Sequence, residues 1–399
     1  MNKTELKYIT LIIAIIIAAC VETDIYLPAF PDMMAFFQVS ETEIQQVLTW
    51  NFLGICIAGP FYGPLSDSIG RRLPLLWALL IFFIGSIFTF ISDNYNILLA
   101  GRLLQGIGSG GCFTLGTAVI FDAFQKENAM RAMNYLNFSI PFIMAGAPML
   151  GGFLNSEYGF RSNFIAIGIL VGFSLLYCLF CFKETLAPQQ RAPFNFTKFR
   201  KDFAKVLGSA SFWQLTLIFN LAFSGYIAFL SSISVFFVTK LGVSKDILPF
   251  YQCALLGAWL IASITCSRLM KHWGAPFMKK MSSVFIVIGG IGLALGMIID
   301  PLSTYIPTAS MMIYTAGINW ILSTYFPESM ELFPDIKGVA ASILTSLRLL
   351  ITVFVIGLVN LFYNETIYPI SGMVIGIILT MLPLMYLYER KTALLQSAN

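Results

Sequence analysis

Apolar segments of about 20 residues recur along the whole chain, and most of the polar breaks between them are short. A segment of that length can cross a bilayer as an α-helix. Because lipid offers no hydrogen-bonding partner to exposed backbone, spanning segments must be helices or the strands of a closed barrel. The apolar runs lack the strict alternation of barrel strands. The sequence therefore predicts an all-α integral membrane protein.

Composition excludes several other classes of protein. The chain has 399 residues, of which 58% are hydrophobic and 11% are charged, and its mean hydropathy is +0.81. Soluble domains carry roughly a quarter of charged residues. This shortage of charge excludes a water-soluble globular protein, a disordered chain and a nucleic-acid-binding protein.

Hydropathy predicts twelve transmembrane helices. They are expected near residues 8–28, 43–65, 73–92, 96–121, 130–154, 162–182, 211–238, 247–270, 277–299, 303–326, 338–362 and 367–388. The only long polar segment between them, 183–210, holds two prolines and a basic excess equal to the formal net charge of +4. We therefore expect an N-terminal six-helix bundle over 1–182, a cytoplasmic basic linker over 183–210 and a C-terminal six-helix bundle over 211–399.

The distribution of lysine and arginine predicts the orientation of the chain. Of the 24 basic residues, Arg102 and Arg348 fall inside predicted spans, and only Arg161, Lys240 and Lys245 fall in loops on one side. All the others lie on the opposite side. Loops rich in lysine and arginine face the cytoplasm, so both termini are expected there.

The loop between the second and third predicted spans carries a dense motif. Gly63, Asp67, Gly70, Arg71 and Arg72 stand in the pattern G-x-L-x-D-x-x-G-R-R. The glycines permit a tight turn, and the arginines can reach helix C-termini or lipid phosphates. By itself this is a positively charged cytoplasmic loop. In a chain with twelve spans, the pattern closely resembles the signature of the major facilitator superfamily.

Four further segments resemble the same superfamily. Arg102–Gly106 is similar to its second motif. Gly146–Gly152 is similar to the proline–glycine motif of its drug:proton antiporters, and Glu184–Leu186 to the "ETL" signature of that group. Asp24–Pro31 resembles the first-helix signature of its bicyclomycin/chloramphenicol-resistance branch.

The match also has departures. Ala147 stands where the proline–glycine motif usually has glycine, and Ile120–Asp122 lacks the arginine that often precedes the aspartate. The loop of residues 267–274 keeps glycine and basic residues but no acid, as a weakened parallel repeat of the first half would. Gly106–Gly111 contains G-x-G-x-x-G, but inside a predicted helix rather than after a strand. Close helix packing through small residues is the expected reason.

The resemblance implies a fold and a function. The fold would be two pseudo-symmetric six-helix bundles in the bacterial inner membrane. The protein would be a secondary active transporter and not an enzyme, exporting a small, largely lipophilic, drug-like molecule as a proton-coupled antiporter. It would act as a monomer without metal, nucleotide or other cofactor, driven by the proton gradient, and it would not bind nucleic acid. The alternatives are a dedicated exporter of one metabolite such as a siderophore, an importer on the same fold, and, more remotely, a polytopic membrane enzyme or sensor.

The motif residues receive gating roles from the same resemblance. Asp67 and its loop are expected to form a gate contact. Pro148, Gly151 and Gly152 have two possible roles, because they could form a helix kink and contact patch or a seal that prevents leak.

Ionisable residues inside spans are costly and mark function. Glu22, Asp24, Arg102 and Arg348 are the candidates. Asp24 is predicted to carry the proton, although it could be an interfacial aspartate. Glu22, about 200° away around a regular helix, should face packed helices or the outer rim. Arg102 is expected to act in coupling, either by binding backbone carbonyls or by pairing with an acid.

The remaining candidates concern the substrate. Arg348 could bind an anionic substrate group, pair with an acid or extend toward the cytoplasm. An aromatic cavity with few charges suits lipophilic molecules, although a single aromatic ring here more often serves packing than ligand contact. Asp122 and Glu328, at helix ends, are expected to be solvated. The predicted cavity residues are Tyr26, Asn51, Tyr135, Asn137, Phe138, Asn220, Phe223, Tyr226, Asn319, Trp320 and Arg348.

Overall fold

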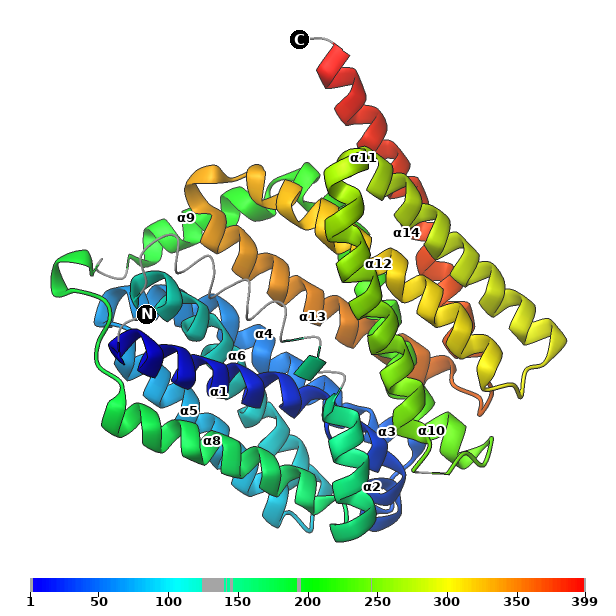
Figure 1. Cartoon of the computed structure of the whole chain (residues 1–399), viewed down its shortest axis with the longest axis horizontal. Coiled ribbons are helices and arrows are strands. Elements are labelled where there is room, and N and C mark those ends of the chain that lie inside the picture. The colour runs from blue at the N-terminus through cyan, green and yellow to red at the C-terminus, as the bar shows by residue number, and fades with distance from the viewer. Residues whose placement is uncertain are drawn as a thin grey trace. The chain divides into compact units, whose positions relative to one another are not determined.

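The computed structural model describes residues 3–123, 140, 142–143, 146–191, 195–244 and 246–397, and within them all regular secondary structure is helical (Figure 1). The elements are α1 (Lys3–Asp24), η1 (Leu27–Ala29), α2 (Phe30–Phe37), α3 (Glu41–Ile44), α4 (Gln46–Ile69), α5 (Arg72–Ile91), α6 (Tyr95–Ala123), α8 (Arg161–Cys181), η2 (Pro188–Gln190), α9 (Phe196–Leu207), α10 (Ala210–Thr239), α11 (Leu248–Ile299), α12 (Tyr305–Glu331), η3 (Pro334–Ile336), α13 (Lys337–Phe362) and α14 (Tyr368–Ser397). A further helix covers residues 146–158.

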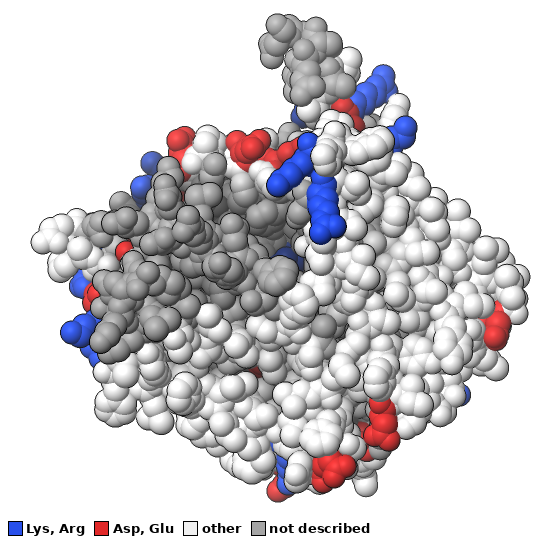
Figure 2. All heavy atoms as spheres, in the orientation of Figure 1, with Lys and Arg blue, Asp and Glu red and all other residues white. Residues whose placement is uncertain are grey.

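Most predicted spans begin and end within about five residues of these helices, but α14 continues to Ser397, nine residues beyond the predicted end at 388. Among the described residues, nine helices are long and apolar enough to cross a membrane. The predicted span 130–154 falls mostly outside the described residues. The spans 247–270 and 277–299 both lie in α11, which is broken at Gly274, where φ is 73°. On the face shown in Figure 2, charged side chains lie near helix ends and almost none lies over the middle of the helices.

The chain divides into two compact units, the first of Met1–Phe196 with Lys245–Pro249 and the second of Thr197–Ser244 with Phe250–Asn399. In the first unit, α4 and α5 both pack along α6, α8 packs on α5, and α1 packs on α6 and α8. In the second unit, α10 packs against α12, α13 and α14. Ser209 is the N-cap of α10, and its hydroxyl accepts a hydrogen bond from the Phe212 N–H at 3.3 Å.

Glycines on α6 allow the helices of the first unit to approach closely. A Cβ on Gly106 would clash with the carbonyl oxygen of Asn51 on α4, and one on Gly108 would clash with Phe82 on α5. The opposing Gly54 on α4 lies at the same crossing. The predicted packing role of the G-x-G-x-x-G pattern is therefore confirmed.

The first predicted helix ends earlier than expected. Helix α1 stops at Asp24, two residues form a turn, and Pro28 lies in the first turn of η1. Proline cannot donate the backbone hydrogen bond that would continue the helix. A Cβ on Gly151, from the helix of residues 146–158, would clash with the carbonyl oxygen of Ile25. The proline–glycine motif thus provides a contact patch at this break.

The basic linker is more ordered than expected. It was predicted as a polar stretch broken by proline, but α9 occupies part of it. The helix is amphipathic: Val206 is buried, while Phe199 stacks on Phe203 with ring centroids 4.2 Å apart. An apolar stripe among basic residues is sufficient to order a short helix against a larger structure.

Candidate functional site

A buried polar cluster joins α1, α4 and α6 in the first unit and extends to Ser86 on α5. It consists of Glu22, Asn51, Arg102, Gln105 and Ser86, which are all almost completely buried. Arg102 Nη1 donates to Glu22 Oε1 and, at 2.7 Å, to Gln105 Oε1. Asn51 Nδ2 donates to the same Glu22 oxygen at 2.7 Å, and Gln105 Nε2 donates to Ser86 Oγ at 3.0 Å. The cluster therefore holds an ion pair in the apolar interior and satisfies part of its hydrogen-bonding capacity.

Arg102 combines the two roles that the sequence left open. Its Nε donates to the Val47 carbonyl at 3.3 Å, and its Nη1 pairs with Glu22. Its Cζ lies 4.2 Å from the ring centroid of Tyr26, and the Tyr26 ring stacks on Phe164. Tyr26 was predicted as a cavity residue, with packing as the commoner role of a single ring, and its ring is completely buried here.

Several buried polar atoms of this region have no hydrogen-bond partner among the described residues. They are Glu22 Oε2, Asp24 Oδ2, Tyr26 Oη, Asn51 Oδ1 and Arg102 Nη2. Buried polar atoms are normally satisfied, and exceptions gather at functional sites. These atoms can therefore form further hydrogen bonds to a water molecule or a ligand, and the carboxylates among them can take up a proton.

Glu22 and Asp24 have different surroundings. Glu22 faces the packed helices α4 and α6, where it contacts Asn51 and Arg102. Of the two predicted positions, packed helices or the outer rim, it therefore has the first. Asp24, the last residue of α1, is 5% exposed and makes no ion pair with any described residue. Arg102 thus pairs with Glu22 and not with Asp24, the predicted proton carrier. The role of Asp24 as proton carrier stays a prediction.

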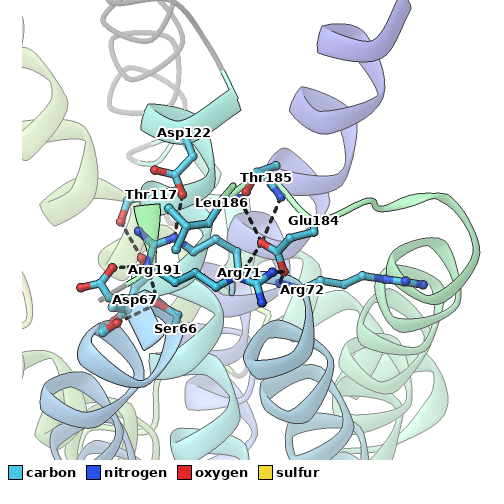
Figure 3. Close-up of polar contacts among 12 residues, drawn as sticks. Ser66, Asp67, Arg71, Arg72, Thr117, Asp122, Glu184, Thr185, Leu186 and Arg191 are labelled. Atoms are coloured by element: carbon cyan, nitrogen blue, oxygen red, sulfur yellow. Dashed lines mark hydrogen bonds and ion pairs between the residues drawn. The ribbon is translucent and has the colours of Figure 1, made fainter. Parts of the chain in front are cut away.

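The 63–72 loop is the centre of a second charged cluster, which Figure 3 shows. We call it the loop cluster and define it as Ser66, Asp67, Arg71, Asp122 and Glu184. Arg71 Nη1 donates to Asp67 Oδ1 at 2.5 Å and to Ser66 Oγ at 2.6 Å, and its Nε donates to Asp122 Oδ2 at 2.6 Å. The motif arginine therefore ties the end of α4 to the end of α6.

Asp122 and Glu328 were both predicted to be solvated. Asp122 is exposed as a residue, but its carboxylate pairs with Arg71, which leaves its side chain 19% exposed. Glu328 is half-buried and pairs with Lys279 at 2.6 Å. In both places a residue near a helix end meets a basic residue from another part of the chain, which hydropathy alone does not indicate.

Glu184 was not among the predicted site residues. Its carboxylate accepts the backbone N–H groups of Arg71, Arg72, Thr185 and Leu186 at 2.8–3.2 Å. Burial raises the pKa of a carboxyl, but these four donors outweigh burial and hold the pKa of Glu184 below its usual range. The only signal in the sequence was its place in the Glu184–Leu186 signature.

The turn beside Glu184 depends on glycine. Gly70 ends α4 with φ of 100°, a conformation that other residues rarely adopt. A Cβ there would clash with the Glu184 carboxylate. Arg191 Nη2 lies 3.9 Å from Glu184 Oε2, and Arg72 Nη2 donates to the Leu179 carbonyl at 2.9 Å. The loop motif is therefore anchored to the segment that follows α8.

We expect Glu184→Gln to lower the stability of the purified protein by about 1 kcal/mol, because hydrogen bonds to a charged acceptor are stronger than those to a neutral one. Since the pKa of Glu184 is lower in the folded than in the unfolded state, its contribution is complete above pH ~4.3 and is lost as the pH falls through the folded value. Thermal unfolding should therefore show a constant difference from pH 5 to 8 that shrinks below about pH 4. Glu157→Gln, at an exposed acid of the same unit, should show no difference, and an equal effect of both changes would contradict the assignment.

The second unit has its own ion cluster, in which Lys279 is buried and its two acidic partners are partly exposed. Lys279 Nζ lies 2.6 Å from Glu328 Oε1 and 2.8 Å from Glu389 Oε1. It also lies 4.7 Å from the ring centroid of Tyr325 and 5.6 Å from that of Tyr388. The loop of residues 267–274 carries no acid, and here the acids come instead from α12 and α14.

The other predicted cavity residues have varied positions. Trp320 donates its indole N–H to the Ala262 carbonyl at 2.9 Å and belongs to a core cluster, so its ring serves packing. Asn319 is almost completely buried on the same helix. Asn220, Phe223 and Tyr226 lie on α10, and Arg348 lies on α13. Tyr135, Asn137 and Phe138 lie outside the described residues.

Comparison with known proteins identifies relatives along nearly the whole chain. The profile described as "Major Facilitator Superfamily" matches residues 11–356. An uncharacterized MFS-type transporter of Bacillus subtilis, YdgK, is 28% identical over 350 residues, covering 86% of this chain and 85% of that protein. A bicyclomycin resistance protein homolog of Haemophilus influenzae is 22% identical over 326 residues, covering 82% and 81%, respectively. Multidrug resistance protein D of Escherichia coli is 24% identical over 360 residues, covering 87% and 86%.

A solved structure supports the fold independently. The human organic anion transporter MFSD10 superposes with a TM-score of 0.68 at 16% sequence identity, covering 97% of this chain and 100% of that one. At this identity the likeness establishes the fold alone. Together with the order of the described helices, it confirms the predicted twelve-helix fold.

Proposed function

Since the chain belongs to the major facilitator superfamily and is a secondary transporter of small molecules rather than an enzyme, we propose that it exports a small, largely lipophilic organic molecule in exchange for protons. The protein would work as a monomer in the bacterial inner membrane, alternately exposing one site to either side. The proton gradient would drive it, without a bound cofactor. The names of its relatives, which include multidrug and bicyclomycin resistance proteins, support export of drug-like molecules.

One observation carries the proton coupling. Glu22, Asp24 and Arg102 lie buried within membrane-spanning helices, although ionisable groups there are costly unless they have a function. Glu22 is bound by Arg102 and Asn51, so protonation would have to displace a cation and a hydrogen bond. Asp24 has no ion pair among the described residues, and its Oδ2 lacks a partner. These surroundings support Asp24 as the group that exchanges a proton.

The proposed cycle needs a site that changes between the two facing states. Asp24 lies where α1 gives way to η1, and the Pro28 ring prevents a continuous helix there. In the cycle, the Asp24 carboxylate takes a proton from the outside and releases it to the cytoplasm after the facing has changed. The Glu22–Arg102 pair keeps α1, α4 and α6 in register during that change. Substrate export is coupled to proton entry because both depend on the same change.

Cells with and without the protein provide the test of export. Expression should raise resistance to one or more lipophilic compounds and lower their cytoplasmic concentration, and dissipating the proton gradient should remove both effects. Secreted metabolites of the same cells should be compared in parallel. A single natural metabolite lost from the medium, with drug resistance unchanged, would indicate the dedicated exporter instead. Higher accumulation of a compound in expressing cells would indicate an importer.

The asymmetry of basic loops predicts cytoplasmic termini. A reporter that is active only in the cytoplasm should therefore work when it is fused after Asn399. A periplasm-only reporter at the same position should be silent, and the same reporter inserted in the loop at 240–245 should be active. Activity of the periplasmic reporter after Asn399 would overturn the orientation.

A further inference from the structure

Arg348 is a cation inside a membrane span without a carboxylate beside it. It lies on α13, nine residues along from Val339, where the span begins. That is about 14 Å along a helix, farther than a side chain extends toward the interface. No described residue forms an ion pair with it, and its buried Nε has no hydrogen-bond partner. Arg102 of the first unit, by contrast, pairs with the carboxylate of Glu22.

An aromatic cluster of the same unit lies beside Arg348. Its Cζ is 5.0 Å from the ring centroid of Phe223 on α10. Phe223 lies 6.3 Å from Trp259 and 6.2 Å from Tyr226, and Tyr226 lies 5.9 Å from Trp259, between ring centroids. Arg348, Phe223 and Trp259 each keep part of their surface accessible. The guanidinium thus lies beside an aromatic cluster in which Phe223 and Trp259 are partly accessible and Tyr226 is buried behind them.

A polar group lies one helical turn from the arginine. Asn220 Nδ2 donates to the carbonyl of Leu344 at 3.5 Å, and Leu344 precedes Arg348 by one turn of α13. The Asn220 side chain is completely buried, and its Oδ1 has no partner in the part of the chain that the structure describes. The α10–α13 contact therefore offers an unused donor, an unused acceptor and aromatic surface.

We propose that Arg348 binds an anionic group of the transported molecule while Phe223 and Trp259, which pack on Tyr226, bind its aromatic or apolar body. The substrate class is then an amphiphilic organic anion, such as an aromatic carboxylate or sulfonate. An unpaired guanidinium in a span is costly, and an anion removes that cost because the fork of N–H donors matches a carboxylate or sulfonate. The inference rests on the proposed transport function and names the charge of its substrate.

The test uses two probes that share one ring system. 8-Anilinonaphthalene-1-sulfonate and N-phenyl-1-naphthylamine differ only in the sulfonate. Their binding is measured by fluorescence on the full-length protein in phosphatidylcholine nanodiscs, with empty discs subtracted. The wild type should bind the sulfonate about tenfold or more tightly than Arg348→Gln does, and the neutral amine should change by less than twofold, because one charge-assisted contact is worth about a factor of ten or more.

Matched variants separate the site from charge in general. Arg348→Lys should keep part of the preference for the anion, because it keeps the charge but loses the fork. Arg200→Gln removes the same charge at an exposed position of α9 and should leave both affinities unchanged. Equal affinity of the wild type for both probes would overturn the proposal, even if the variants do not fold. An equal loss of affinity for both probes in Arg348→Gln would also overturn the proposal, because it would show that Arg348 serves packing and not recognition of the anion.

An anionic lipid is the other source of the same chemistry. Adding phosphatidylglycerol to the discs should not weaken binding of the sulfonate, because a headgroup does not reach the depth of Arg348. Competition by the lipid would assign the arginine to a headgroup and overturn the proposal. The assay needs no proton gradient. Anion preference without proton-coupled flux would support the anion site and refute the proposed function. Proton-coupled flux without anion preference would support the proposed function and refute the anion site.

Discussion

Replacing either Glu22 or Arg102 by glutamine should destabilise the protein by about 3–5 kcal/mol, because each change leaves the opposite charge buried and uncompensated. The two side chains are completely buried, and they pair with each other within the cluster of α1, α4 and α6. Asn51 and Gln105 also bind them, so the loss of one partner leaves further groups unsatisfied. No other single change described here should cost as much stability.

The double variant Glu22→Gln/Arg102→Gln provides the control. It removes both charges together, so it should recover much of the loss, and the coupling energy of the double-mutant cycle should be about 2 kcal/mol or more. Equilibrium unfolding of the four purified proteins in one detergent measures it. Additive effects of the two single changes would show that the pair does not hold the helices together.

Asp24→Asn should abolish proton-driven export while it leaves substrate binding largely intact. Asparagine has nearly the shape of aspartate but cannot exchange a proton, and Asp24 makes no ion pair with the described residues whose loss would unfold the protein. Proton flux and substrate binding should be measured on the same purified variant. The expected result is a flux reduced to the background of protein-free vesicles, with a Kd within a few-fold of the wild-type value.

Glu22→Gln is the comparison for that result. Per folded molecule it should retain more transport than Asp24→Asn or alter the choice of substrate, because Glu22 is held by Arg102 and Asn51 and is not free to exchange a proton. Normal coupled flux in Asp24→Asn, together with its loss in Glu22→Gln, would reverse the assignment of the proton carrier.

Periodic features of the fold were predictable from the sequence. The predicted spans 73–92 and 211–238 differ from α5 and α10 by one residue at either end, because a run of apolar residues bounded by charge determines a membrane helix almost alone. The break after Asp24 was less predictable. A proline such as Pro28 disrupts a helix locally, but where α1 ends also depends on the close contact at Ile25 and Gly151.

The partners of the charged residues were not predictable in the same way. Hydropathy places Arg102 inside a span, but its partner depends on how α6 is rotated against α1, which long-range packing decides. Glu184 and Asp122 lie far from the 63–72 loop in sequence, and only the fold brings them to Arg71. The unpaired state of Arg348 could likewise be seen only when its neighbours on α10 and α11 were known.

Proton exchange is the central claim, and proton flux in vesicles tests it most directly. The purified protein is reconstituted into vesicles that contain a pH-sensitive dye, a proton gradient is imposed, and candidate lipophilic substrates, including organic anions, are added. The account predicts that a transported substrate dissipates the gradient in wild-type vesicles and that Asp24→Asn vesicles do not respond. Substrate movement at the same rate with and without the gradient, and with no associated proton movement, would contradict it.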